Sequence, residues 1–254
     1  MNRLLPIDLH AHIEADIAPT DLVDLGAVVF AATRSLDEAA RVLGRSDPLT
    51  IWGVGCHPGL VGAQKAFDAQ RFSSLIARTA YVGEVGLDGK SRVPMEAQRA
   101  TLSAVLKELQ ESPRIISIHS FAATEAVLTC LSEQPVSGAV LHWWLGNAEQ
   151  TRRVIDLGCY FSVNLAMVRQ ADLLTRIPLD RVLPETDHPF GDRSGGRGRR
   201  PGRVDDVEQA LARLHQLTPE EIRQITWRNL GQLTQQTRCG MLLPRQVRVA
   251  LAAA

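Results

Sequence analysis

The sequence of 254 residues has no apolar run of the roughly 18 residues that a membrane-spanning helix requires. Its first residues also lack the basic head, apolar stretch and cleavage site of a secretory signal peptide. It has only four cysteines, and no Cys-x-x-Cys pair occurs, which argues against a disulfide framework and a zinc knuckle. These absences predict a cytoplasmic protein with reduced thiols and no membrane contact.

The chain also lacks an excess of charge of either sign, because 28 basic residues balance 28 acidic ones. This balance argues against a globally basic nucleic-acid-binding protein. The distribution is uneven, because residues 191–203 carry five arginines and one aspartate, and the tail from Arg238 carries three arginines and no acid. Positive charge is therefore concentrated in one loop and at the C-terminal end.

Short apolar runs alternate with longer segments of helical periodicity. Such runs, apolar on both faces, are typical of buried parallel strands. Eight strand–helix units in about 240 residues predict a single (β/α)8 TIM-like barrel of the α/β class, because doubly wound sheets commonly have five or six strands. The gap after the first run is too short for a full helix. The predicted strands are residues 4–9, 27–32, 50–55, 80–86, 114–119, 139–142, 160–163 and 181–186.

Two helix starts carry strong capping signals. Ser35 and Glu38 are predicted to form a capping box, in which the side chain of each residue accepts a hydrogen bond from the backbone N–H of the other. Thr218, followed by proline and two glutamates, begins a helix that we expect to run to about Gln236. We assign residues 1–243 to the barrel and 244–254 to a C-terminal tail that either docks a partner or frays.

Six side chains that can bind a metal fall at or near the C-terminal ends of predicted strands. A single histidine there is usually an ordinary core or rim residue, but this combination is hard to obtain by chance. The two histidines of Ile-Asp-Leu-His-Ala-His point to the same face of their strand, and the strand ends of a barrel converge on one rim. The candidate ligands are His10, His12, Glu84, His119, His142 and Asp187.

Four imidazoles and two carboxylates suit Zn²⁺ or Mn²⁺, whereas Mg²⁺ prefers a more oxygen-rich shell. Six ligands exceed the four that a tetrahedral zinc needs. We therefore expect two divalent metal ions (Zn, Mn or Mg) about 3.5–4 Å apart, bridged by Glu84 and a water. Such a centre supplies hydroxide near neutral pH, and Asp187 can accept the proton of the attacking water.

Motifs along the whole barrel resemble the TatD family of metal-dependent hydrolases, part of the amidohydrolase-like superfamily. They are Ile-Asp-Leu-His-Ala-His at 7–12, Gly-Cys-His-Pro at 55–58, Gly-Glu-Val-Gly-Leu-Asp at 83–88, Gln98, Ile-His-Ser at 118–120, His142 with Gly146, Glu-Thr-Asp-x-Pro at 185–189, and Asn229. The resemblance implies metal-dependent nuclease activity, typically 3′→5′ exonucleolytic on DNA. It also implies one metal on His10, His12, Glu84 and Asp187, and another on Glu84, His119 and His142.

Within the family, four segments resemble QatD, the TatD-like component of Qat anti-phage defence systems. They are Ser-Ile-His-Ser, Leu-His-Trp-Trp-x-Gly, Tyr-Phe-Ser-Val-Asn-x-Ala-Met and Arg-Val-Leu-Pro-Glu-Thr-Asp-His-Pro-Phe. This resemblance implies a defence role and contacts with other Qat proteins. Two positions depart from the family pattern: Phe121 replaces the arginine after Ile-His-Ser, and Gly59 replaces a common histidine. Both lie on the substrate side, so the metal centre should survive while substrate preference stays open.

Further residues are expected around the centre. His57 either contacts a substrate phosphate or is a plain rim histidine. Trp143 and Trp144 cannot both face the mouth, and we assign base stacking to Trp143. Asp8 and Glu185 precede ligands by two residues, so we expect them to orient ligand imidazoles from one layer deeper.

The stretch 191–203 contains five glycines and five arginines and follows the last predicted strand. We expect a flexible loop over the active-site rim that binds a nucleic-acid backbone, with a solvated loop as the alternative. Its candidate substrate contacts are Arg197, Arg199 and Arg200.

Three functions fit these residues. The first is a nuclease that cleaves DNA or RNA, which the arginine-rich loop favours. The second is a small-molecule hydrolase acting on an amide or ester with the same two-metal site, which a narrow apolar mouth would favour. The third is a subunit of a defence complex whose metal site mainly organises an assembly. Our prediction is the nuclease.

Overall fold

A computed structural model of the chain describes residues 4–194, 196 and 198–253. All eight predicted strands are present, and every residue in them is buried except the half-buried His119. The first strand starts later than predicted and continues past His10. The strands are β1 (Ile7–Ala11), β2 (Val28–Ala31), β3 (Thr50–Trp52), β4 (Tyr81–Gly86), β5 (Ile115–His119), β6 (Ala139–Leu141), β7 (Tyr160–Val163) and β8 (Val182–Pro184).

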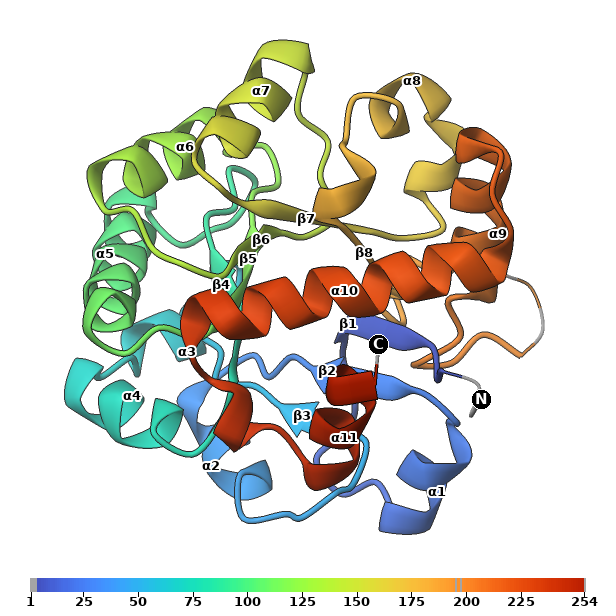
Figure 1. Cartoon of the computed structure of the whole chain (residues 1–254). Coiled ribbons are helices and arrows are strands. Elements are labelled where there is room, and N and C mark those ends of the chain that lie inside the picture. The colour runs from blue at the N-terminus through green and yellow to red at the C-terminus, as the bar shows by residue number, and fades with distance from the viewer. Residues whose placement is uncertain (1–3, 195, 197, 254) are drawn as a thin grey trace.

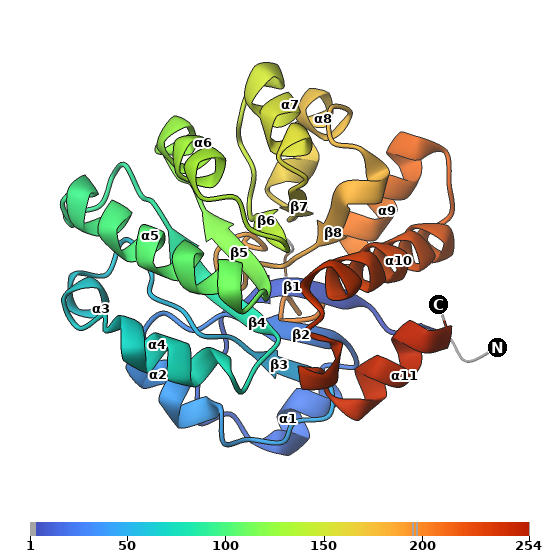
Figure 2. The ribbon, with the colours of Figure 1, turned by 60° about the vertical axis from the view of Figure 1, so that its left-hand side comes forward.

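The strands pair in parallel in two sheets, ordered β1-β2-β3 and β4-β5-β6-β7-β8. Hydrogen bonds join the sheets at both seams. Beyond β3, the Val54 N–H donates to the Tyr81 carbonyl at 3.2 Å, and at the other seam the Asp187 N–H donates to the His10 carbonyl at 2.8 Å. The strands thus form a ring with helices outside it (Figure 2), which confirms the α/β barrel-like fold.

Helices connect successive strands and cover the outside of the ring (Figures 1 and 2). The first connection holds only a six-residue helix, as its short length predicts. The helices are α1 (Pro19–Asp24), α2 (Leu36–Val42), α3 (Val61–Lys65), α4 (Ala69–Ile76), α5 (Met95–Glu111), α6 (Thr124–Glu133), α7 (Ala148–Asp156), α8 (Ala171–Leu174), α9 (Asp205–His215), α10 (Pro219–Thr237) and α11 (Arg245–Ala253), with 3-10 turns at Met167–Arg169, Leu179–Arg181 and Gly240–Leu242.

The capping signals are confirmed in one case and corrected in the other. At α10, Thr218 accepts from the Glu221 N–H and the Glu221 side chain accepts from the Thr218 N–H, which completes the capping box. At α2, Ser35 accepts from the Glu38 N–H, but the Glu38 carboxylate accepts from the Arg34 N–H at 2.7 Å. The Glu38 carboxylate therefore accepts from the backbone N–H of Arg34 and not, as predicted, from that of Ser35. It still satisfies a backbone donor that precedes the helix.

α10 crosses the N-terminal end of the ring, in the centre of Figure 1. Its buried Trp227 donates its indole N–H to the Leu5 carbonyl at 2.8 Å, just ahead of β1. Asn229 donates to the Val182 carbonyl at 2.7 Å, where β8 begins. Leu230 and Leu233 join the apolar layer at this end of the barrel. The opposite end is left for the polar groups described below.

The chain beyond α10 returns to the barrel. Val247 of α11 is fully buried in the same apolar layer, whereas Val249 is 60% exposed. All four cysteines are free and buried, as their spacing predicts. In the described part of the chain, no helix is long and apolar enough to span a bilayer.

Candidate metal centre

The first cluster of donor atoms lies at the C-terminal end of β1. His10 and His12 both direct their Nε2 atoms toward Glu84 and Asp187. His10 Nε2 is 3.8 Å from Glu84 Oε2 and 3.8 Å from Asp187 Oδ1. His12 Nε2 is 3.3 Å and 3.6 Å from the same two oxygens. The Nε2 atoms of both β1 histidines therefore lie near a carboxylate oxygen of β4 and a carboxylate oxygen of the segment after β8.

A second cluster surrounds the other oxygen of Glu84. Glu84 Oε1 lies 2.6 Å from His119 Nδ1 and 3.0 Å from His142 Nε2. These two nitrogens are 3.3 Å apart. The two oxygens of the Glu84 carboxylate thus face different imidazoles. All six residues selected from the sequence come together around Glu84.

An irregularity in β4 places Glu84 at the centre of the ring. The pairing register with β5 shifts between Val82 and Val85, and the Glu84 N–H donates instead to the Thr33 carbonyl at 2.9 Å, beyond β2. The backbone is so close here that a Cβ on Gly55 would lie 1.8 Å from the Thr33 carbonyl oxygen. Only glycine fits at position 55, so the glycine of the Gly-Cys-His-Pro motif allows the Glu84 backbone to approach Thr33.

The β1 imidazoles are held from behind by their other ring nitrogens. His10 Nδ1 lies 2.7 Å from the hydroxyl of the buried Ser117, and His12 Nδ1 lies 3.3 Å from the Ala32 carbonyl. With Nδ1 donating its hydrogen to these oxygens, each Nε2 keeps a lone pair directed at the cluster. Such contacts fix the ring orientation of metal-binding histidines.

The two acids expected behind the ligands behave differently. Glu185 Oε1 lies 3.7 Å from His142 Nδ1, so it faces a ligand imidazole as expected. Asp8 contacts no ligand imidazole. Its carboxylate accepts from the Thr186 hydroxyl at 2.6 Å and from the Gly202 N–H at 2.7 Å. Asp8 therefore fixes the backbone after β8, because Thr186 and the returning loop lie closer to it than any imidazole does.

The donor atoms fit divalent metal ions. Within the described residues, His10 Nε2 and Glu84 Oε2 of the first cluster are buried without a hydrogen-bond partner. Buried polar atoms are normally paired, so two unpaired atoms facing one another require an explanation such as a bound ion. Ligands about 2.1 Å from a tetrahedral ion lie roughly 3.4 Å from one another. The separations of 3.3–3.8 Å in the first cluster match that spacing.

Burial and the neighbouring charges shift the protonation of the cluster. Burial disfavours the Glu84 carboxylate, but the surrounding imidazoles, His57 foremost, outweigh it and hold the pKa of Glu84 well below its ordinary value. Burial raises the pKa of Asp187 to about 7, although His142 opposes the shift. Burial also lowers the pKa of His10, which keeps its imidazole in the neutral, metal-binding form.

A cavity of about 1020 Å³ opens above the cluster, and His57 and Trp143 both line it. His57 Nδ1 accepts from the Gly59 N–H at 2.8 Å, so the ring proton of the neutral imidazole sits on Nε2, 3.4 Å from Glu84 Oε2. Trp144 is fully buried and donates its indole N–H to the Thr151 hydroxyl. The two tryptophans therefore divide as expected, with Trp143 at the mouth.

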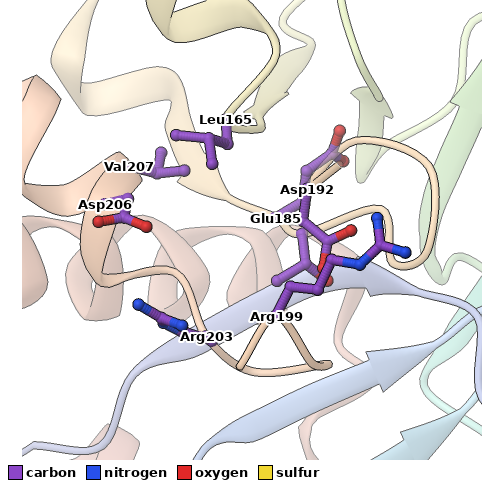
Figure 3. Close-up of a pocket in the computed structure, with 8 residues that line it drawn as sticks. Leu165, Glu185, Asp192, Arg199, Arg203, Asp206 and Val207 are labelled. Atoms are coloured by element: carbon purple, nitrogen blue, oxygen red, sulfur yellow. The ribbon is translucent and has the colours of Figure 1, made fainter. Parts of the chain in front are cut away.

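Of the selected loop arginines that the structure describes, neither Arg199 nor Arg200 lines this cavity. Arg199 lines a separate pocket of about 10 Å³ beside Glu185 and Asp192 (Figure 3). Arg200 is exposed and lines neither pocket, and Arg197 lies outside the described residues. Arg193 is the described arginine of this loop that lines the metal cavity. The loop returns to β1 at its C-terminal end, because the Gly202 N–H donates to the carboxylate of the buried Asp8.

Sequence reasoning missed several residues that line the cavity. Asp88 places Oδ2 3.7 Å from His119 Nε2, and its place in Gly-Glu-Val-Gly-Leu-Asp, four residues after Glu84, could have indicated it. Arg169 lines the cavity from the turn after β7, where no motif distinguishes it. Phe190 adds exposed apolar surface at the mouth, beside Phe121, which the sequence had already placed on the substrate side.

The chain is similar to known proteins in sequence and in fold. The sequence profile of the family described as TatD related DNase matches residues 7–235. The chain is 29% identical over 251 residues to an uncharacterized metal-dependent hydrolase, YabD, of Bacillus subtilis, covering 89% of this chain and 97% of that protein. It is also 29% identical over 118 residues to the 3′-5′ ssDNA/RNA exonuclease TatD of Klebsiella pneumoniae, covering 43% and 45% of the two chains.

Among solved structures, the fold matches that of YjjV, a TatD homologue from Escherichia coli K12. The TM-score is 0.77 at 22% sequence identity, over 89% of this chain and 97% of that one. This likeness extends over the barrel and identifies the fold.

Proposed function

The chain belongs to the TatD related DNase family, and from this premise we propose that it is a two-metal phosphodiesterase that cleaves DNA. RNA is the second polymer substrate in this proposal, and cleavage proceeds 3′→5′ from a strand end. The relative described as a 3′-5′ ssDNA/RNA exonuclease supports both choices. Activity in the cytoplasm is consistent with four buried cysteines that form no disulfide.

The division of the six ligands supports two ions. In our proposal His10, His12, Glu84 and Asp187 hold one ion, and Glu84, His119 and His142 hold the other. The observation that carries this proposal is the position of Glu84, whose Oε2 faces the β1 histidines while its Oε1 faces His119 and His142. A carboxylate shared in this way is suited to bridging two ions.

The ions would supply an activated water and neutralise charge on the phosphate oxygens. Asp187 lines the cavity and is placed to take the proton of the attacking water. His57 lines the cavity beside Glu84, and in this proposal it contacts a phosphate oxygen of the substrate. Trp143 offers its ring at the mouth to a terminal base.

The test combines metal analysis with cleavage of 5′-labelled single- and double-stranded DNA and RNA in Zn²⁺, Mn²⁺ and Mg²⁺. We expect two ions per chain and a ladder of labelled products that shortens from the 3′ end. Asp187→Asn should lower the rate by at least about 10³-fold, because it removes a metal ligand and the base together. Asp180→Asn, at an exposed acid, is the matched control. Failure to cleave any polymer in any of the three metals would overturn the proposal.

The apolar side chains at the mouth favour a second candidate, a hydrolase of small amides or esters with the same centre. Phe121 is 52% exposed and Leu145 48% exposed, and both line the cavity. A panel of small esters, lactones and amides assayed beside the polymers separates the candidates. Turnover of a small substrate without polymer cleavage would establish the second.

We further propose that the nuclease acts in anti-phage defence with other Qat proteins, on the basis of the four QatD-like segments. The unit 1–243 carries the chemistry, and the tail 244–254 contacts a partner through its exposed face, which includes Val249. Plaque counts in cells that express the full system should rise when Asp187→Asn replaces the wild type. Equal protection by both would favour a mainly structural role in the complex.

A further inference from the structure

A second pocket of about 570 Å³ adjoins the metal cavity on the side of β6 and β7. It is lined by residues 145–147, which follow β6, and by residues 169–173 and Arg176, which lie between β7 and β8. We call it the outer groove. Leu145 and Arg169 line both the groove and the metal cavity, so the two spaces meet at these side chains. The helices beside the groove, α7 and α8, lie next to each other in Figures 1 and 2.

Two arginines in the outer groove lack acidic partners. Arg169 and Arg176 are exposed, and within the described residues neither side chain forms an ion pair or hydrogen bond. Among the described residues that line the groove, Asp172 is the one carboxylate. On neighbouring α7, by contrast, Arg153 is neutralised by Glu125 at 2.7 Å. Unpaired cations in a concave surface attract an anionic chain.

The charges of the metal cavity indicate where such a chain would leave it. The cations other than histidine that line the cavity in the described residues are Arg169 and Arg193. Arg193 lies over the Phe190 ring at 5.4 Å, beside the segment after β8. The wall beyond β5 instead presents Phe121, an exposed apolar side chain. Phosphates beyond the cleaved one therefore find positive charge toward β7 and β8, and none at Phe121.

We propose that the outer groove binds the body of a single-stranded nucleic acid whose end is at the metals. Arg169 contacts a phosphate at the junction, and Arg176 contacts another farther out. A single strand suits this path, because its successive bases are free to stack on the aromatic side chains at the mouth. This inference rests on the proposed nuclease function and names its substrate and the path of the strand.

The test measures binding of fluorescent single-stranded DNA by anisotropy as salt increases, with Asp187→Asn in every protein to prevent cleavage. Each lost phosphate contact should reduce the slope of log affinity against log salt by about 0.7. For a strand of about ten nucleotides, Arg176→Ala should lower the slope by about 0.7 and the double variant R169A/R176A by about 1.4. Arg213→Ala, an exposed arginine on α9 that lines neither space, is the matched control.

A dinucleotide, which ends inside the cavity, should bind Arg176→Ala and Arg213→Ala equally. The inference is overturned if Arg176→Ala and R169A/R176A keep the slope of Arg213→Ala with the longer strand. It is also overturned if Arg176→Ala weakens the dinucleotide and the longer strand equally. Either result can occur while the wild type still cleaves DNA, so it leaves the nuclease proposal standing. Absence of polymer cleavage by the wild type would instead remove the nuclease proposal itself.

Discussion

The two ends of the barrel have opposite chemistry. At the N-terminal end, α10 packs Trp227, Leu230 and Leu233 against the strands, and the Trp227 indole N–H donates to the Leu5 carbonyl. At the C-terminal end, the buried groups include His10 and Glu84, whose Nε2 and Oε2 atoms lack partners in the described residues. One end is complete as folded, and the other still has unsatisfied ligand atoms.

This difference separates stability from function along the barrel axis. An unpaired buried polar atom costs about 1–3 kcal/mol, so the ligand atoms at the rim lower the free energy of unfolding of the metal-free protein. Apolar burial at the other end offsets that cost at roughly 25 cal/mol per Å². Substitutions at the rim should therefore change chemistry and metal binding, and substitutions beneath α10 should change stability. Four experiments test this separation.

The largest effect is expected from Glu84→Gln, which keeps the shape of the side chain and removes the charge shared by both clusters. Cleavage should fall by about 10³-fold or more, because both ions lose a ligand. Metal analysis should give fewer than two ions per chain. Glu125→Gln, at an exposed acid on α6, should leave both readouts unchanged. Retention of two ions and near-normal cleavage would show that Glu84 does not bridge them.

At the opposite end, Trp227→Ala should lower the free energy of unfolding by about 3–5 kcal/mol, because a buried indole leaves a large cavity. The bond to the Leu5 carbonyl is lost as well. Chemical denaturation measures the change, and kcat at low temperature should stay near the wild-type value. Trp143→Ala, at the half-buried mouth, should cost far less stability. A large loss of kcat in folded Trp227→Ala would break the separation of the two ends.

Metal removal should lower the stability of the protein by the same amount whether or not the packing beneath α10 is intact. A ligand present at 100 times its Kd stabilises the native state by about 2.7 kcal/mol. Chelation should therefore lower Tm by roughly 5–10 °C for a domain of this size. Thermal melts of the wild type and Trp227→Ala, with and without chelator, should show similar shifts. A shift that Trp227→Ala abolishes would mean that the two ends are coupled.

The smallest effect is expected from Glu185→Gln, which acts on the metal through His142. Partners of ligand imidazoles typically contribute 10- to 100-fold to metal affinity. Competition with a chromophoric chelator should show a weaker site of that order. Glu208→Gln, at the buried ion pair with Arg223, should reduce stability and leave metal affinity unchanged. Equal metal affinity in Glu185→Gln and wild type would show that the 3.7 Å contact with His142 is incidental.

Residues within strands were the ones most readily predicted. Side chains alternate along a strand, so His10 and His12 had to share a face, and the strand ends of a barrel had to meet. The loop after β8 follows no such period. Arg199 was expected at the rim, yet its loop is held by the bond from Gly202 to Asp8, and it lines the small pocket of Figure 3 instead. Arg169, after β7, was missed for the same reason.

The sequence by itself determined the eight strands, the barrel and the six candidate ligands, because periodicity and strand-end position depend on local order along the chain. Only the tertiary structure decided that one oxygen of Glu84 faces the β1 histidines and the other faces His119 and His142. Only it brought Arg169 and Leu145 to the junction of two cavities. These relations join residues far apart in the chain, so their distances depend on how the whole ring closes.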